Sequence, residues 1–273
     1  MKYLLSISFV FMSYFLFSQD PNISNLHTFR TYINPGYVGF SDNLNVNIGH
    51  HRQWLYVPRA LETTIMSTNF YCDTRGIGLG MLALNNKEGE GYMTTNSISG
   101  IIAKNIFGLI KPKRSKRIMR YELTGALQFG IMQKSLDWSG LTFSDQLDAR
   151  YGNIKNTSAT PKVESSPIIP DVGGGIMARF SPFGGRYSIR PKKKRRPAKE
   201  RLFKGSTDGN YSTIGVSFQH LNQPEESFLG GTTKLPTRWN LHGNINLQNT
   251  TDKAVNMYSL NFLYQTQGEL TTL

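Results

Sequence analysis

The chain has 273 residues, a formal net charge of +13 and one cysteine, Cys72. A single cysteine excludes an intramolecular disulfide framework and a zinc site built on cysteines. Two short segments, 111–117 and 186–201, together carry a charge equal to the whole net charge, so the basicity does not indicate a broad nucleic-acid-binding face.

The first eighteen residues predict secretion. Lys2 precedes an apolar stretch from Leu4 to Phe17, and Ser18 supplies a small residue just before Gln19. A basic start, a short apolar run and a small residue at the cut are typical of a signal peptide. The rival is an uncleaved anchor, but a bilayer-spanning helix needs about 20 residues. We therefore expect a signal peptide over 1–18, a periplasmic N-terminal segment over 19–42 and a β-barrel domain over 43–273.

The first predicted strand follows a turn at Asn34-Pro35-Gly36, where a fixed proline φ precedes a permissive glycine. Leu44, Val46 and Ile48 fall on one side of this strand, and Asn43, Asn45 and Asn47 fall on the other. This alternation matches the pleat of a β-strand. Both a soluble sandwich and a membrane barrel with lipid outside and water inside can show it.

Eight further strands are expected from the same period of two. They cover about 61–71, 76–86, 92–107, 121–132, 170–180, 211–221, 238–248 and 254–265. No convincing amphipathic helix interrupts them. The predicted fold class is all-β and antiparallel.

Two patterns that could carry chemistry have simpler explanations. Glycines 76, 78 and 80 could cradle a phosphate, but no helical pattern or GK[ST] follows, so we expect glycine on the inner face of a crowded sheet. Asp145 and Asp148 lack the spacing of a calcium loop and are expected in a solvated loop over 136–169.

The histidines do not define an enzyme either. His220 and His242 lie on predicted neighbouring strands near Ser217, but no G-x-S-x-G elbow and no placed acid accompany them. Hydrogen bonding in a barrel lumen is the favoured interpretation. We expect no catalytic residues, no cofactor and no metal.

An outer-membrane barrel is preferred over a sandwich. The polar faces are mostly uncharged, and several strands reach the length of about 9–11 residues that a tilted strand needs to cross a bilayer. About nine strands are counted, although single-chain barrels have even numbers, and the sequence stops directly after a strand. We therefore expect a transmembrane β-barrel that is incomplete at the C-terminus.

If the N-terminus is periplasmic, alternating reversals place both basic runs in the periplasm, including the long insertion over about 181–210. These runs could dock an acidic partner or anionic lipid headgroups, or could simply be solvated turns. No nucleic-acid partner is expected behind a signal peptide. The candidate contact residues are Lys111, Lys113, Arg114, Lys192, Lys193, Lys194, Arg195 and Arg196.

Several short motifs are ordered and spaced as in a known family. They include NPGYVG at 34–39, HRQW at 51–54, GIGLG at 76–80, DWS at 137–139, PDVG at 170–173, GVSFQH with QP at 215–224, and YQTQG at 264–268. On these motifs the chain resembles the PorP/SprF family of Bacteroidetes outer-membrane proteins, associated with type IX secretion and gliding motility. The signature positions are Asn34, Pro35, Tyr37, Gly39, Arg52, Trp54, Asp137, Trp138, Pro170 and Asp171.

The resemblance implies a non-enzymatic barrel that helps to secrete adhesins or hold them at the surface. It also implies periplasmic type IX secretion components, a secreted adhesin-like client and outer-membrane lipid as partners. The basic run at 186–201 and the missing final strands depart from the family pattern. The alternative function is a passive pore or small-molecule transporter of the outer membrane.

Overall fold

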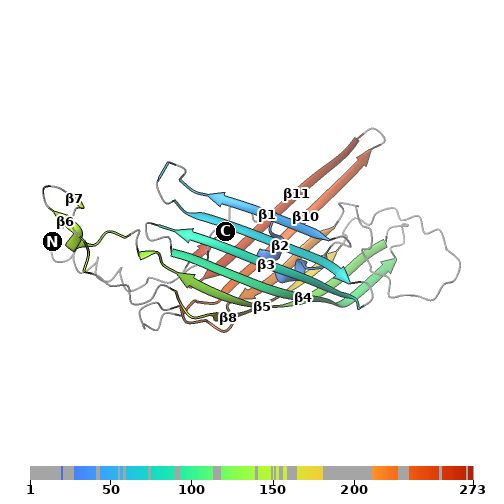
Figure 1. Ribbon diagram of the computed structural model, residues 1–273. Coiled ribbons are helices and arrows are strands. Elements are labelled where there is room, and N and C mark those ends of the chain that lie inside the picture. Colours follow the sequence, from blue (N-terminus) through green and yellow to red (C-terminus); the bar gives the residue numbers. More distant parts are fainter. Residues whose placement is uncertain are drawn as a thin grey trace, which may run out of the picture.

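The computed structural model describes residue 20 and residues 28–40, 44–54, 56–57, 60–72, 75–89, 93–112, 118–138, 141–148, 150, 152–153, 156–158, 165–180, 211–226, 234–251, 254–268 and 270–272. Ten strands of this part form one sheet in the order β1-β2-β3-β4-β5-β8-β9-β10-β11-β12. Each strand of this sheet therefore pairs with the sheet strands that precede and follow it in the chain, and all pairs are antiparallel (Figure 1).

The nine expected strands are all present, which confirms the predicted all-β, antiparallel fold. The long strands are β1 (Asn45–Arg52), β2 (Glu62–Cys72), β3 (Ile77–Glu88), β4 (Met93–Pro112), β5 (Ile118–Ser135), β8 (Ile169–Phe180), β9 (Ser212–Gln219), β10 (Arg238–Thr251) and β11 (Ala254–Gln267). A tenth, β12 (Leu270–Thr272), was not predicted. The 136–168 connection holds η3 (Ser144–Gln146) and the small β6 (Leu147–Asp148) and β7 (Gly152–Asn153) pair.

The sheet curls into an open half-barrel with β1 and β12 at its edges (Figure 1). Its two faces differ as the alternating pattern predicts. Leu44, Val46 and Ile48 expose 66, 51 and 69% of their surface on the outer face, whereas Asn45 and Asn47 point inward to hydrogen-bond with β2. Apolar side chains continue along the outer face of the other long strands, as an exterior that contacts lipid requires.

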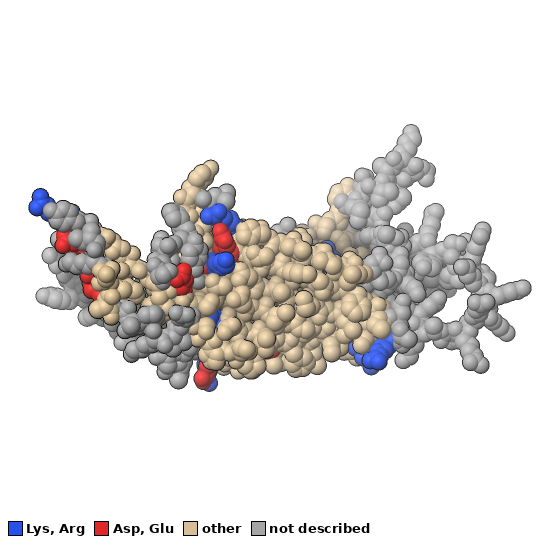
Figure 2. Space-filling model, in the orientation of Figure 1, with Lys and Arg blue, Asp and Glu red and all other residues tan. Residues whose placement is uncertain are grey.

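The outer face is also nearly free of charge over its middle. Figure 2 shows a surface without Lys, Arg, Asp or Glu across the central strands, with charged side chains near its margins. No helix in the described part of the chain is long and apolar enough to cross a membrane.

The buried core lies on the inner face, where the N-terminal segment (residues 28–40) packs against the sheet (Figure 1). This segment contains α2 (Arg30–Ile33) and η1 (Pro35–Tyr37). The core residues are Phe29, Tyr32 and Val38 from the segment and Ile65, Leu82, Leu84, Ile101, Ala103 and Ala126 from β2 to β5.

The turn predicted at Asn34-Pro35-Gly36 is present, and residues 34–39 also fill the curve of the sheet. Residues 1–18 with the predicted signal peptide lie outside the described residues. So do 113–117 and 181–210, together with the side chain of Lys111. Because the chain leaves β4 and β8 at the same end of the sheet, both basic runs are attached at that end.

Candidate functional site: the seat of the N-terminal segment

The N-terminal segment owes its shape to the NPGY motif. Pro35 begins η1, where its missing N–H costs nothing, and the Gly36 N–H donates to the Asn34 side-chain Oδ1 at 2.8 Å. Gly39 then turns the chain with a φ of +74°, a left-handed conformation that favours glycine. The motif therefore makes a compact double turn that presents the Asn34 side chain to the sheet.

Asn34 joins this turn to three strands at once. It is 0% exposed. Its Nδ2 donates to the backbone carbonyls of Ile176 on β8 and Val216 on β9, both at 3.2 Å. The same nitrogen lies 2.9 Å from Nε2 of His242 on β10. A buried amide with this many partners specifies one position of the turn on the sheet.

His242 extends the contact into a chain of hydrogen bonds. Because an amide nitrogen can only donate, Nε2 of His242 faces Asn34 as an acceptor and shares the two Nδ2 hydrogens with the two carbonyls, so Nδ1 carries the proton of the neutral ring. That Nδ1 lies 3.3 Å from the hydroxyl of Tyr37, which in turn lies 3.1 Å from Oγ1 of Thr213. The His242 ring thus accepts a hydrogen bond from Asn34 and donates one to Tyr37, and both of these residues belong to the N-terminal segment.

The carbonyls at the end of α2 are satisfied by side chains of the sheet. The end of a helix leaves carbonyl groups without intrahelical partners. Here the Ile33 carbonyl accepts from the hydroxyl of Ser217 at 2.5 Å and from Nδ2 of Asn240 at 3.0 Å. The Tyr32 carbonyl accepts from Nε2 of Gln219 at 2.7 Å. Polar residues of β9 and β10 therefore act as a cap for a helix that belongs to another part of the chain.

A buried charge cluster holds Asp20, which precedes the N-terminal segment. Its Oδ2 lies 2.7 Å from Nη1 of Arg238 and 2.9 Å from Nε2 of His220. Nδ1 of His220 lies 2.9 Å from Oδ1 of Asp171, and Arg238 also donates to the hydroxyl of Tyr32 at 2.6 Å. Two carboxylates thus face one guanidinium and one imidazole.

The cluster changes the protonation of its members. Burial lowers the pKa of His220, but the charge of Asp20 and hydrogen bonds to Asp171 and Asp20 outweigh it and raise the pKa to about 9. Burial would raise the pKa of Asp20, yet the charges of Arg238 and His220 hold it well below its usual range. Both ring nitrogens of His220 face carboxylate oxygens, so the imidazolium is the form that satisfies them.

The opposite end of the segment is held by Arg179 of β8. Its guanidinium lies 4.3 Å from the ring centroid of Phe40 and donates to the Phe40 carbonyl at 3.4 Å. Glu122 on β5 forms an ion pair with the same guanidinium. This pairing keeps two buried charges compensated on the inner face.

The signature residues divide between two regions. Asn34, Pro35, Tyr37 and Gly39 form the turn, and Asp171 belongs to the charge cluster, so the structure brings this part of the set together on the inner face. The others lie toward one end of the sheet: Pro170 accepts from Asn222 at 2.6 Å, Arg52 pairs with Glu62 at 3.2 Å, Trp54 is exposed, and Trp138 next to Asp137 stacks on Phe143.

The sequence patterns identified the polar faces of β9 and β10, but they did not show what these faces bind. Ser217, His220 and His242, the trio considered for a hydrolase, each contact the N-terminal segment or Asp20. Arg238, Asn240 and Gln219 were not singled out. The only local signal is a run of inward amide, imidazole and guanidinium groups on β10, denser than a solvated wall needs. No group of His, Cys, Asp or Glu among the described residues could hold a metal ion.

The polar residues of β8, β9 and β10 that hold Asp20 and the N-terminal segment are called the seat. The fold and the seat define a class of protein: a membrane-type antiparallel half-barrel with a lipid-compatible exterior and a polar interior that binds its own N-terminal segment. Residues 16–191 match the family model of the type IX secretion system membrane protein PorP/SprF. The match spans more than half of the chain, and the chain belongs to this family. It is therefore a membrane protein of a family that acts in type IX secretion. The motifs after residue 191 lie outside this match. Searches of curated proteins and of solved structures found no protein that matches the chain.

Proposed function

We propose that this chain is a non-enzymatic accessory of the type IX secretion system in the outer membrane, which helps to secrete or anchor surface adhesins. The observation that carries the proposal is the seat of the N-terminal segment. Polar side chains that a catalytic site or an aqueous passage would use instead bind the backbone and side chains of residues 20 and 28–40. An interior whose polar groups already bind the chain's own N-terminal segment is consistent with a structural, accessory role.

The proposed partners are periplasmic components of the secretion machine and an adhesin-like client. Lys111, Lys113, Arg114 and the run from Lys192 to Arg196 are the candidate contacts for an acidic periplasmic surface. Their segments are attached at one end of the sheet, which would let both reach the same partner. The apolar outer face supports contact with outer-membrane lipid.

Gene deletion tests the secretion role. Loss of surface display of type IX clients, restored by the wild-type gene, is expected. Normal display in a strain that also lacks any paralogue would contradict the proposal.

A charge-neutral variant tests the partner contact. With Lys192 to Arg196 changed to Gln, periplasmic proteins that co-purify with the wild-type chain should be depleted, while the level of the barrel in the outer membrane stays the same. Arg52→Gln is the matched control, because it removes a cation from the sheet itself. Unchanged co-purification would show that the basic run is only a solvated turn.

The passive pore remains the second candidate, because Asn, Ser, Thr and Gln side chains cover the inner face. Planar-bilayer recordings of the purified chain separate the two. A seated N-terminal segment predicts little steady conductance in the wild type and more in Asn34→Ala. Large, steady wild-type conductance would favour the pore.

A further inference from the structure

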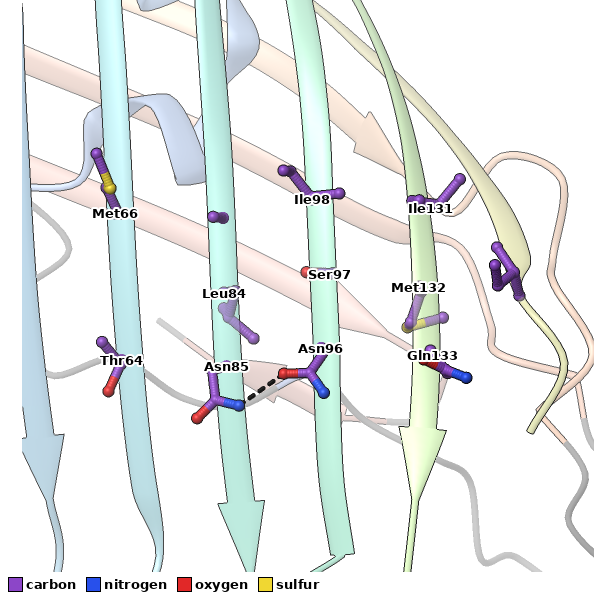
Figure 3. Close-up of a pocket in the computed structure, with 12 residues that line it drawn as sticks. Thr64, Met66, Leu84, Asn85, Asn96, Ser97, Ile98, Ile131, Met132 and Gln133 are labelled. Atoms are coloured by element: carbon purple, nitrogen blue, oxygen red, sulfur yellow. Dashed lines mark hydrogen bonds between the residues drawn. The ribbon is translucent and has the colours of Figure 1, made fainter. Parts of the chain in front are cut away.

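A groove on the outer face of β2 to β5 is distinct from the seat. It has a volume of about 360 Å³ and is bounded by side chains of four neighbouring strands (Figure 3). Clefts of this size, mostly apolar with a few placed polar groups, are typical of ligand sites. Because this face contacts lipid, the groove is continuous with the membrane.

The register of the sheet gives the groove an apolar floor beside a polar border. The floor row places Met66, Ala83, Ile98 and Ile131 side by side. The next row toward the 136–168 connection places Thr64, Asn85, Asn96 and Gln133 side by side, as Figure 3 shows. An apolar chain in the groove would therefore end beside hydrogen-bonding groups.

The two asparagines leave a donor and an acceptor for a ligand. Nδ2 of Asn85 donates to Oδ1 of Asn96 at 2.6 Å. Oδ1 of Asn85 and Nδ2 of Asn96 make no hydrogen bond to another described residue. One donor beside one acceptor complements an amide or hydroxyl group, whereas an ester offers acceptors alone.

A cation follows in the third row, two residues along β3 and on the same face. Lys87 pairs in register with Glu62 and Thr94, and Glu62 is in an ion pair with Arg52 at 3.2 Å. Two residues of a strand cover about 7 Å. Lys87 therefore lies within side-chain reach of an anionic group attached just beyond the amide row.

We propose that this groove binds a phosphorylated, amide-linked acyl lipid of the lipid A class. The acyl chain lies over Ile98 and Ile131, the amide or hydroxyl group bonds to Asn85 and Asn96, and the phosphate faces Lys87. The proposal depends on the membrane placement of the family and not on the secretion role, so the two can fail separately.

Native mass spectrometry of the purified full chain in detergent tests the site, with lipid A and dimyristoylphosphatidic acid as the two probes. Lipid A should be retained in preference to phosphatidic acid, which carries phosphate but only ester linkages. The variant N85A/N96A should lose this preference by about threefold to tenfold, as expected for lost hydrogen bonds. Lys87→Gln should weaken both probes.

Ile98→Trp fills the groove and should abolish retention of lipid A, while Ile214→Trp, on the outer face of β9, should not. Circular dichroism checks that all variants keep the sheet. Equal retention by Ile98→Trp and the wild type would overturn the site. Equal binding of the two probes, unaffected by N85A/N96A, would overturn the assignment of an amide-linked lipid.

Discussion

At the scale of residues, Asn34 is the single side chain on which the seat depends most. Asn34→Ala removes the buried amide that contacts β8, β9 and β10 and leaves Nε2 of His242 without this donor, and one buried unsatisfied group costs about 1–3 kcal/mol. We expect the free energy of unfolding to fall by about 1–3 kcal/mol, measured by urea denaturation in micelles. Asn47→Ala is the control, because Asn47 makes one long contact, 3.4 Å, to Ser67. Equal stability of Asn34→Ala and wild type would contradict this role.

The charge cluster predicts a stability that depends on pH. The pKa of His220 is raised to about 9 from an ordinary 6.5, so its contribution is complete below pH 6.5 and is lost as pH rises through 9. The lowered pKa of Asp20 means that its contribution is complete above its ordinary 3.8 and is lost as pH falls below that value. The groups facing His220 are Asp20 and Asp171, with Arg238 beside Asp20.

Limited proteolysis near Asp20 should therefore be slowest from about pH 5 to 7 and should accelerate as pH rises toward 9. His220→Gln keeps hydrogen bonding without the titrating charge and should remove the alkaline acceleration. A profile that is the same in the variant and the wild type would place the titrating group elsewhere.

At the scale of elements, glycines on β3 create the space that the N-terminal segment occupies. A Cβ at Gly78 would lie 2.5 Å from the Val38 carbonyl oxygen, which is backbone and has little freedom to move. A Cβ at Gly80 would lie 2.8 Å from the Val38 side chain. This confirms the expectation of glycine on a crowded inner face for Gly78 and Gly80, whereas Gly76 lies in the turn before β3 with a φ of +67°. The group that crowds it is the N-terminal segment.

Gly78→Ala should therefore destabilise the packed segment by about 1–3 kcal/mol, the usual cost of overpacking. Gly100→Ala is a matched control on β4, because a Cβ there meets nothing within 4 Å. The control should be neutral or slightly stabilising. Urea midpoints and protease resistance of both variants provide the measurement, and equal behaviour would show that the segment is not held against β3.

At the scale of the whole molecule, the outer face predicts insertion into lipid. Ile102 of β4 exposes 52% of its surface in the middle of this face. Ile102→Lys should cost about 2–4 kcal/mol if the residue lies near the bilayer midplane, while Ile102→Leu should cost little. The measurement is folding into phospholipid vesicles, and equal yields for the two variants would contradict the assignment of this face to lipid.

Much of the architecture could be read from local pattern. The alternation of Leu44, Val46 and Ile48 with asparagines identified both the strand and its two faces, since neighbouring side chains of a strand must point in opposite directions. Even strand order was accessible, because each strand pairs with the next along the chain. The short β12 lacked a pattern long enough to detect.

Period and motif are local properties, so they were enough to identify the strands, their faces and the family. What the inner face binds depends on contacts that form only in the folded chain. The hydrogen bonds of Asn34 reach 142 to 208 residues along the chain, and the cluster of Asp20 and His220 reaches 200. No local period encodes such a pairing, since it exists only after the sheet has curled around the N-terminal segment. The NPGY motif can be predicted as a turn from the sequence. Only the curvature of the sheet brings β8, β9 and β10 into contact with that turn.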